Sequence, residues 1–137
     1  GDSAATFNYA QQFADQATDT IYGNMYNKYL IEIYTGILPQ PERAAAIAAR
    51  ELTNRATPQT NAWYAWSLFA AGKKEEAYKV FEASVSGKPL EALELYWMGK
   101  LMQGLGKGYN AKEFFKAAWV NKYDLSPAMV QDLENSR

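Results

Sequence analysis

The chain has 137 residues, of which 48% are hydrophobic, and it carries 14 basic and 15 acidic side chains. This composition argues against a disordered chain, and the formal net charge of −1 leaves no surplus of basic charge for binding nucleic acid. The sequence contains no Cys and no His, which excludes disulfides, thiol nucleophiles, thiolate zinc sites and hydrolytic triads that depend on imidazole. No apolar run reaches the roughly 20 residues of a membrane span, so we expect one domain over residues 1–137 without a transmembrane segment.

Prolines mark the starts of several predicted helices. No stretch shows the alternation and the β-branched enrichment of a strand, so we predict an all-α chain. A proline is tolerated at the first helical position because its missing N–H has no partner there in any case. Thr57 and Ser126 each precede a proline and are predicted N-caps. The four prolines predicted in first turns are Pro41, Pro58, Pro89 and Pro127.

Glycines mark the predicted helix ends. Gly36, Gly72 and Gly106 each follow an apolar-periodic run, where a residue with a left-handed backbone would end a helix. The connecting segments are mostly short, so successive helices are expected to be antiparallel neighbours. The predicted helices cover, in chain order, residues 4–19, 24–35, 42–55, 58–71, 74–86, 90–104, 109–121 and 127–135.

Two stretches of the chain share a pattern of residue size at an offset of 34 residues. A shared pattern of residue size with few identical residues is expected where helices pack closely, because packing constrains side-chain volume rather than residue type. Small residues would let two backbones approach, and a Phe four residues after a small one would lie on the same helix face and fill the gap. The matching pairs are Ala65/Gly99, Leu68/Met102, Gly72/Gly106, Ala77/Ala111, Phe81/Phe115 and Ser84/Ala118.

This pattern resembles the tetratricopeptide repeat, whose period is 34 residues and whose signature combines W-x2-L-G-x2-Y, A-x3-F and a closing proline. Gly99, Ala111, Phe115 and Ala118 stand at motif positions, whereas Asn61 departs from the expected large aromatic residue. The resemblance implies antiparallel helix pairs stacked as a short right-handed solenoid. Its units would be an N-terminal helix (1–23), a degenerate repeat (24–56), two repeats (57–88 and 89–123) and a capping helix (124–137).

The order of features from residue 56 to residue 118 also resembles the closing repeats of bacterial envelope and secreted tetratricopeptide proteins. That resemblance implies a periplasmic or secreted location rather than a cytoplasmic one. It also implies that the chain is the C-terminal part of a longer protein.

No group of residues in the sequence forms a catalytic constellation. The segment GLGKG (104–108) lacks the preceding strand and the closing Ser/Thr of a phosphate loop, so it is interpreted as a repeat turn. Two carboxylate pairs, Glu75/Glu76 and Glu91/Glu94, stand in predicted first helical turns, where acids complement the helix dipole. We therefore expect no enzyme activity, no cofactor and no metal. The lysines near the end are interpreted as a solvated face: Lys100, Lys107, Lys112, Lys116 and Lys122.

Aromatic residues make up 15% of the chain, with four Trp, ten Tyr and six Phe. In the tetratricopeptide family, ligands commonly lie on the concave surface made by the first helix of each repeat. The resemblance implies a groove on these helices, in which Trp66 and Lys100 occupy the same slot one repeat apart. The predicted binding residues are Gln59, Ala62, Trp63, Trp66, Phe69, Leu93, Tyr96, Trp97, Lys100 and Gln103.

The leading hypothesis for the function is a non-catalytic scaffold that binds a partner protein or peptide on this face, as a monomer or weak homodimer. Aromatic side chains in such a groove are also suited to stacking on a glycan or another small molecule, which is the alternative. A third class is an accessory fragment of an enzyme whose catalytic part lies elsewhere. The same rings would instead be core if the predicted N-terminal helix covered them with Phe7 and Phe13.

Overall fold

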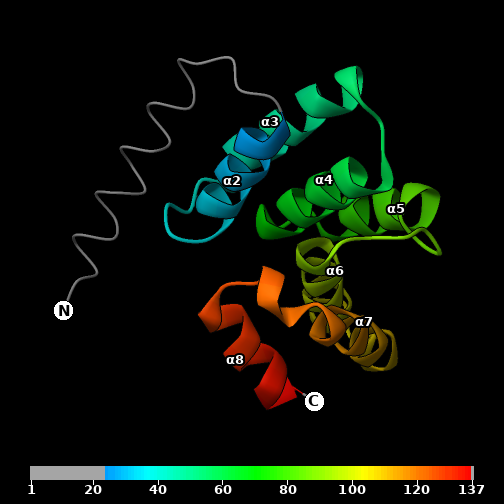
Figure 1. Cartoon of the computed structure of the whole chain (residues 1–137). Coiled ribbons are helices and arrows are strands. Elements are labelled where there is room, and N and C mark those ends of the chain that lie inside the picture. Colours follow the sequence, from blue (N-terminus) through cyan, green and yellow to red (C-terminus); the bar gives the residue numbers. More distant parts are fainter. Residues whose placement is uncertain (1–23, 137) are drawn as a thin grey trace.

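In the computed structural model, residues 24–136 are described, and every regular element in that range is helical (Figure 1). The all-α class is therefore confirmed for these residues, whereas the predicted helix at 4–19 lies outside them. The elements are α2 (Asn24–Thr35), α3 (Pro41–Asn54), α4 (Pro58–Ala70), α5 (Lys74–Ser84), α6 (Ala92–Gly104), α7 (Gly108–Val120), the 3-10 helix η1 (Lys122–Asp124) and α8 (Pro127–Ser136).

Three of the four prolines begin helices as predicted, those of α3, α4 and α8. Thr57 and Thr60 form a reciprocal capping box at α4: the Thr57 hydroxyl accepts from the Thr60 N–H at 3.1 Å, and the Thr60 hydroxyl accepts from the Thr57 N–H at 2.8 Å. Ser126 accepts from the Met129 N–H at 3.3 Å. These bonds satisfy N–H groups that lack partners inside the helix.

The prediction for Pro89 was wrong, because α6 begins only at Ala92, with Glu91 as its N-cap. The reason lies in where α6 packs. It lies against α4 rather than folding back on α5, so the chain needs several non-helical residues to cross from one pair to the next.

Two glycines end helices with the same hydrogen-bond pattern, 34 positions apart. Gly72 (φ 85°) and Gly106 (φ 77°) both have the left-handed backbone that favours glycine. After α4, the Lys73 N–H donates to the Leu68 carbonyl at 2.9 Å; after α6, the Lys107 N–H donates to the Met102 carbonyl at 2.8 Å. These are Schellman turns, so the predicted glycine helix ends are confirmed at both sites.

The prediction that Gly36 has a left-handed backbone was wrong, because its φ is not positive. A wider turn ends α2 instead. The Leu38 N–H donates to the Ile33 carbonyl at 2.9 Å, and the Gln40 N–H donates to the Tyr34 carbonyl at 2.8 Å. This turn carries Leu38 into the core, and burial of that side chain replaces the usual glycine stop.

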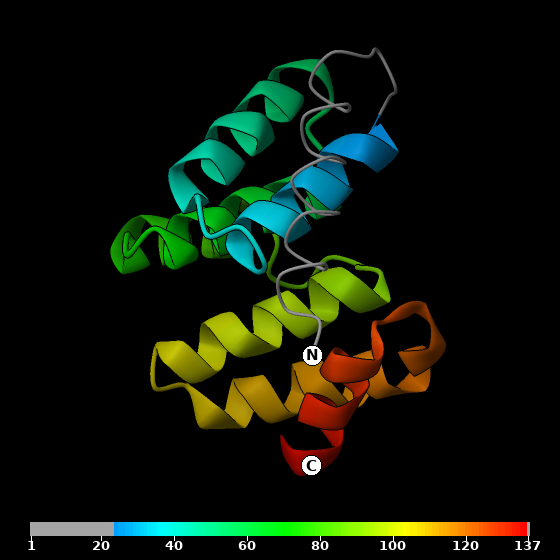
Figure 2. The ribbon, with the colours of Figure 1, turned by 90° about the vertical axis from the view of Figure 1, so that its left-hand side faces the viewer.

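The helices lie as three pairs one above another, α2/α3, α4/α5 and α6/α7, with α8 beside the last pair (Figure 2). Close approach within the last pair depends on Gly99, because a Cβ there would lie 2.4 Å from the Phe115 ring. The small residues of the 34-residue pattern are buried as expected, including Ala65, Ala77 and Ala111.

The two junctions between pairs are not equivalent. The first pair meets the second mainly through α3 and α4, whereas the second meets the third through α4 and α6. An edge-to-face contact between Phe81 and Phe114, with ring centroids 5.8 Å apart, adds α5 and α7 to the second junction. Among the helices described, none is long and apolar enough to cross a membrane.

Candidate functional site

The ten residues predicted to form a groove lie along α4 and α6, which pack on each other. Five of them are buried, namely Ala62, Trp63, Leu93, Tyr96 and Trp97. Four are half-buried, namely Gln59, Trp66, Phe69 and Lys100, and Gln103 is exposed. The structure therefore brings the set together, but mostly as the interface between two helices. Ligand binding by these residues stays a prediction.

The aromatic members of the set contact one another rather than solvent alone. Trp66 stacks on Trp97 with ring centroids 5.9 Å apart and planes 9° from parallel, and it also stacks on Phe69 at 5.9 Å. Its indole N–H donates to the Thr35 hydroxyl of α2 at 3.1 Å. Phe69 lies over Gly104, where a Cβ would come within 2.1 Å of the ring. These contacts place the rings of Trp66, Phe69 and Trp97 at the packing interface between α4 and α6.

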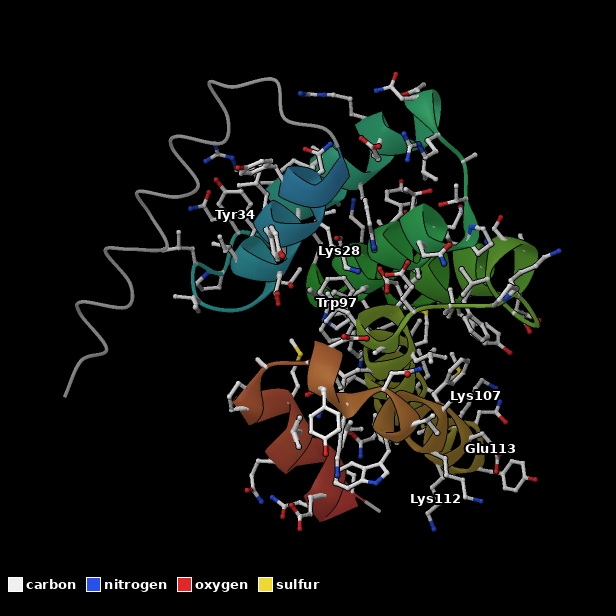
Figure 3. The ribbon with its side chains drawn as sticks, in the orientation of Figure 1. Lys28, Tyr34, Trp97, Lys107, Lys112 and Glu113 are labelled. Carbon is white, nitrogen blue, oxygen red and sulfur yellow. The ribbon has the colours of Figure 1, made fainter. Side chains whose placement is uncertain are left out.

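A buried carboxylate joins three helices at one end of this interface. Glu94 of α6 is fully buried, and it accepts the indole N–H of Trp63 from α4 at 2.6 Å. Lys28 of α2 lies 3.1 Å from the same carboxylate and 3.5 Å from that of Glu91; Figure 3 labels Lys28 at this junction. Sequence reasoning assigned Glu94 to the helix dipole. It stands in the first turn of α6 as expected, but its partners come from two other helices.

A second polar network fixes α8 to α6. The Tyr96 hydroxyl donates to Asp132 at 2.5 Å, and Lys100 lies 3.1 Å from the same carboxylate. Burial raises the pKa of Asp132, but the hydrogen bonds from Tyr96 and Lys100 outweigh it and hold that pKa below its usual value. Burial and the neighbouring Asp132 together raise the pKa of the Tyr96 hydroxyl. The lysine expected at the rim of the groove is therefore already paired.

A cavity of about 910 Å³ lies between α2 and α8, and its lining includes Tyr96 of α6. Tyr29 is 48% exposed and Ile37 is 50% exposed, so apolar surface at its rim faces solvent. We call this cavity the α2–α8 groove; it is lined by Tyr29, Glu32, Ile33, Gly36, Ile37, Tyr96, Ser126, Ala128 and Met129.

Sequence reasoning found one residue of this groove, Tyr96, and missed the rest. The surface that α8 contributes to the groove gave no signal in the sequence. An apolar residue in a terminal capping helix can either line a groove or pack in the core. The sequence is consistent with both roles, and only the placement of α8 distinguishes them.

The lysines predicted to form a solvated face, in and beside α7, do not all face solvent. Lys112 and Lys116 are exposed, whereas Lys107 lies over the Tyr78 ring at 4.9 Å and Lys122 over the Trp119 ring at 3.9 Å. A cavity of about 680 Å³ between α7 and α8 mixes the two exposed lysines with acids, including Glu113; Figure 3 labels Lys107, Lys112 and Glu113. Mixed charge gives this cavity no net preference for an ion.

Within residues 24–136, no three acidic side chains are grouped in a way that could hold a metal ion. The groups with shifted pKa values include Glu32, whose pKa is raised by burial and by Glu94, partly offset by Lys28. The lining of the α2–α8 groove, to which Glu32 belongs, also includes the hydroxyl-bearing residues Tyr29, Tyr96 and Ser126.

A scan against protein-family models, a search of curated proteins and a search of solved structures each returned no match for this chain.

Proposed function

We propose that this chain is a non-catalytic helical-repeat module of the tetratricopeptide type, and that it binds a helical segment of a partner protein in the α2–α8 groove. The observation that carries the proposal is the groove itself. It offers about 910 Å³ of mostly apolar space beside two large side chains that are half exposed, Tyr29 and Ile37. Partly exposed apolar clefts between helices are common docking sites for amphipathic helices.

The repeat assignment is supported by features that recur at the 34-residue offset. The Schellman turns at Gly72 and Gly106 have the same bonds, and the small residues Ala65 and Gly99 are buried in equivalent places. Ligand binding on the inner helices is the family's usual mode, and α2 and α6 are inner helices in that assignment. In this proposal the binding site lies between α2, α6 and α8 rather than at the α4–α6 interface.

Protein binding is favoured over glycan binding by the state of the aromatic rings. Sugar recognition by stacking needs an open aromatic face, and the flat surfaces of Trp66 and Trp97 are stacked on each other. Tyr96 supplies its hydroxyl to Asp132. A helix with apolar anchors needs no free ring face, because it is held by burial of side chains in the groove.

The proposal is tested by selecting displayed amphipathic helical peptides on the full chain and measuring their affinity for two variants. Ile37→Asn alters the groove, and Val120→Asn makes the same change at a position on α7 that is 76% exposed. We expect Ile37→Asn to weaken the selected peptides by about tenfold, which is the loss of one apolar anchor, and Val120→Asn to leave them unchanged. Equal losses in both variants, or failure to select any peptide, would contradict the proposal.

A further inference from the structure

The α2–α8 groove continues into a smaller cavity of about 280 Å³. The two share four lining residues, Tyr29, Glu32, Ser126 and Met129, so they form one continuous depression with two ends. One end is apolar, between Ile37 and the first turn of α8. The other lies where the start of α6 meets η1.

The second end is acidic. Three carboxylates line the smaller cavity, those of Glu32, Glu91 and Asp124. Lys28 is the one cation among the described residues that line it. Its ammonium group is already committed to the buried Glu94 at 3.1 Å. Lys28 also lies 3.5 Å from Glu91, so its one ammonium group is shared between the buried Glu94 and a lining carboxylate. Three carboxylates and one cation line the cavity, so its lining has an excess of negative charge.

We propose that the partner segment is a basic amphipathic helix, with its apolar side chains seated against Ile33, Ile37 and Met129 and its Lys or Arg side chains against Glu32 and Asp124. This inference rests on the proposed function and names the chemistry of the partner. Charge complementarity at such a rim selects among partners and raises the association rate. The depression runs along α2, which is 12 residues long or about 18 Å, so roughly three helical turns of the partner make contact.

The state of Glu32 fits an incoming cation. Burial raises the pKa of this carboxyl group, partly offset by Lys28, and so disfavours its charged form. A Lys or Arg side chain brought within a few ångströms would favour the charged form again. Binding of the basic helix is therefore expected to lower the pKa of Glu32.

Other segments of the chain are less suited to the acidic end. Residues 1–23 contain three Asp and no Lys or Arg, so they carry the wrong charge for it. The α7 face of a second copy offers exposed Lys112 and Lys116 next to Val120. Self-association through that face is the competing occupant that the experiment has to distinguish.

The experiment measures the affinity of the full chain for three fluorescein-labelled helical peptides by anisotropy. All three have the same apolar residues; one ends in three Lys, one ends in three Glu, and one is a scramble of the basic peptide. The measurements are repeated on Glu32→Gln/Asp124→Asn and on the control Glu75→Gln/Glu76→Gln, which removes two exposed acids from the first turn of α5. Asp124→Asn alone, at an exposed position, serves if the double variant does not fold.

We expect the basic peptide to bind at least tenfold more tightly than the acidic one, and we expect this advantage to disappear in Glu32→Gln/Asp124→Asn but not in the α5 control. The advantage should also shrink as the pH is lowered through the raised pKa of Glu32, because a neutral Glu32 no longer attracts the peptide. A purely structural role of Glu32 would not produce that pH profile.

Equal affinity for the basic and acidic peptides would overturn this inference and leave the proposed function standing. If the basic, the acidic and the selected helical peptides all fail to bind, both this inference and the proposed function are overturned. Concentration-dependent dimers in sedimentation that the basic peptide does not dissociate would assign the groove to a second copy of this chain and overturn the inference as well.

Discussion

Large apolar side chains lie both between α4 and α6 and between α2 and α8, but they are packed in the first place and partly exposed to solvent in the second. Between α4 and α6, Trp66, Trp97 and Phe69 are stacked on one another. Between α2 and α8, Tyr29 and Ile37 remain about half exposed. Tyr29 stands on α2, and Ile37 stands in the turn that follows it. The difference is how closely the described helices approach each other: α4 and α6 pack directly on one another, whereas a cavity of about 910 Å³ lies between α2 and α8.

The largest expected effect of this difference is on stability. Trp97 is 2% exposed, so Trp97→Ala removes a large buried side chain and leaves a cavity. We expect it to lower the free energy of unfolding by about 3–5 kcal/mol. Ile37→Ala, at the rim of the groove, should cost about 1 kcal/mol or less. Urea denaturation followed by circular dichroism gives both values, and similar costs for the two variants would abolish the distinction between packed interface and open groove.

The carboxylates that contact Lys28 allow a second, matched pair of variants. Glu94→Ala leaves the Trp63 indole and the Lys28 ammonium without their buried partner, and we expect a loss of about 3–5 kcal/mol. The Glu91 side chain is 69% exposed, so Glu91→Ala should cost well under about 1 kcal/mol. Thermal melts at one protein concentration compare the stability of the two variants. A Glu94→Ala variant as stable as Glu91→Ala would show that the buried ion pair does not hold α2, α4 and α6 together.

Two glycines of the last helix pair test close packing on a smaller scale. A Cβ at Gly99 would meet the Phe115 ring at 2.4 Å, whereas a Cβ at Gly108 would meet nothing within 4 Å. We expect Gly99→Ala to cost about 1–3 kcal/mol through overpacking. Gly108→Ala should stabilise by a few tenths, up to about 1 kcal/mol, because alanine restricts the unfolded chain. Urea midpoints measure the difference, and a stabilised Gly99→Ala would contradict the packing described for α6 and α7.

The smallest expected effect concerns the contact that positions α8. The pKa of Asp132 is lowered in the folded chain, so its contribution is present above the pKa of the unfolded carboxyl group and is lost as the pH falls through the lower folded value. Asp132→Asn should therefore cost about 1 kcal/mol or less at neutral pH and almost nothing in strong acid. Urea titrations across the acid range test this. A destabilisation by Asp132→Asn that increases as the pH falls would contradict this prediction.

Much of the local structure could be predicted from the sequence, because helix-capping residues and helix-ending glycines act through hydrogen bonds to residues nearby in the chain. Thr57 and Gly72 determine helix ends through bonds to residues within five positions, and both were identified. Pro89 and Gly36 were misjudged because their surroundings depend on where a more distant helix packs. The crossing from α5 to α6 and the burial of Leu38 are consequences of tertiary structure.

The candidate site was predictable only in part for the same reason. The 34-residue offset placed Tyr96 on an inner helix, and this residue does reach the groove. The partner of Glu94 is Lys28, 66 residues away, and no local pattern connects them. Met129 and Ala128 line the groove because of where α8 packs, which depends on the buried Leu133 and on the contact of Asp132 with Tyr96 and Lys100 and is not encoded by periodicity.

The central claim is that the α2–α8 groove, rather than the α4–α6 interface or the outer face of α7, receives the partner. It is tested most directly by methyl chemical shifts recorded while the basic amphipathic peptide is titrated into the full chain. We expect the largest changes at Ile33, Ile37 and Met129, which line the groove, and little change at Val80 of α5 or Val120 of α7. Shifts concentrated at Val80 or Val120, with the groove methyl groups unmoved, would contradict the claim.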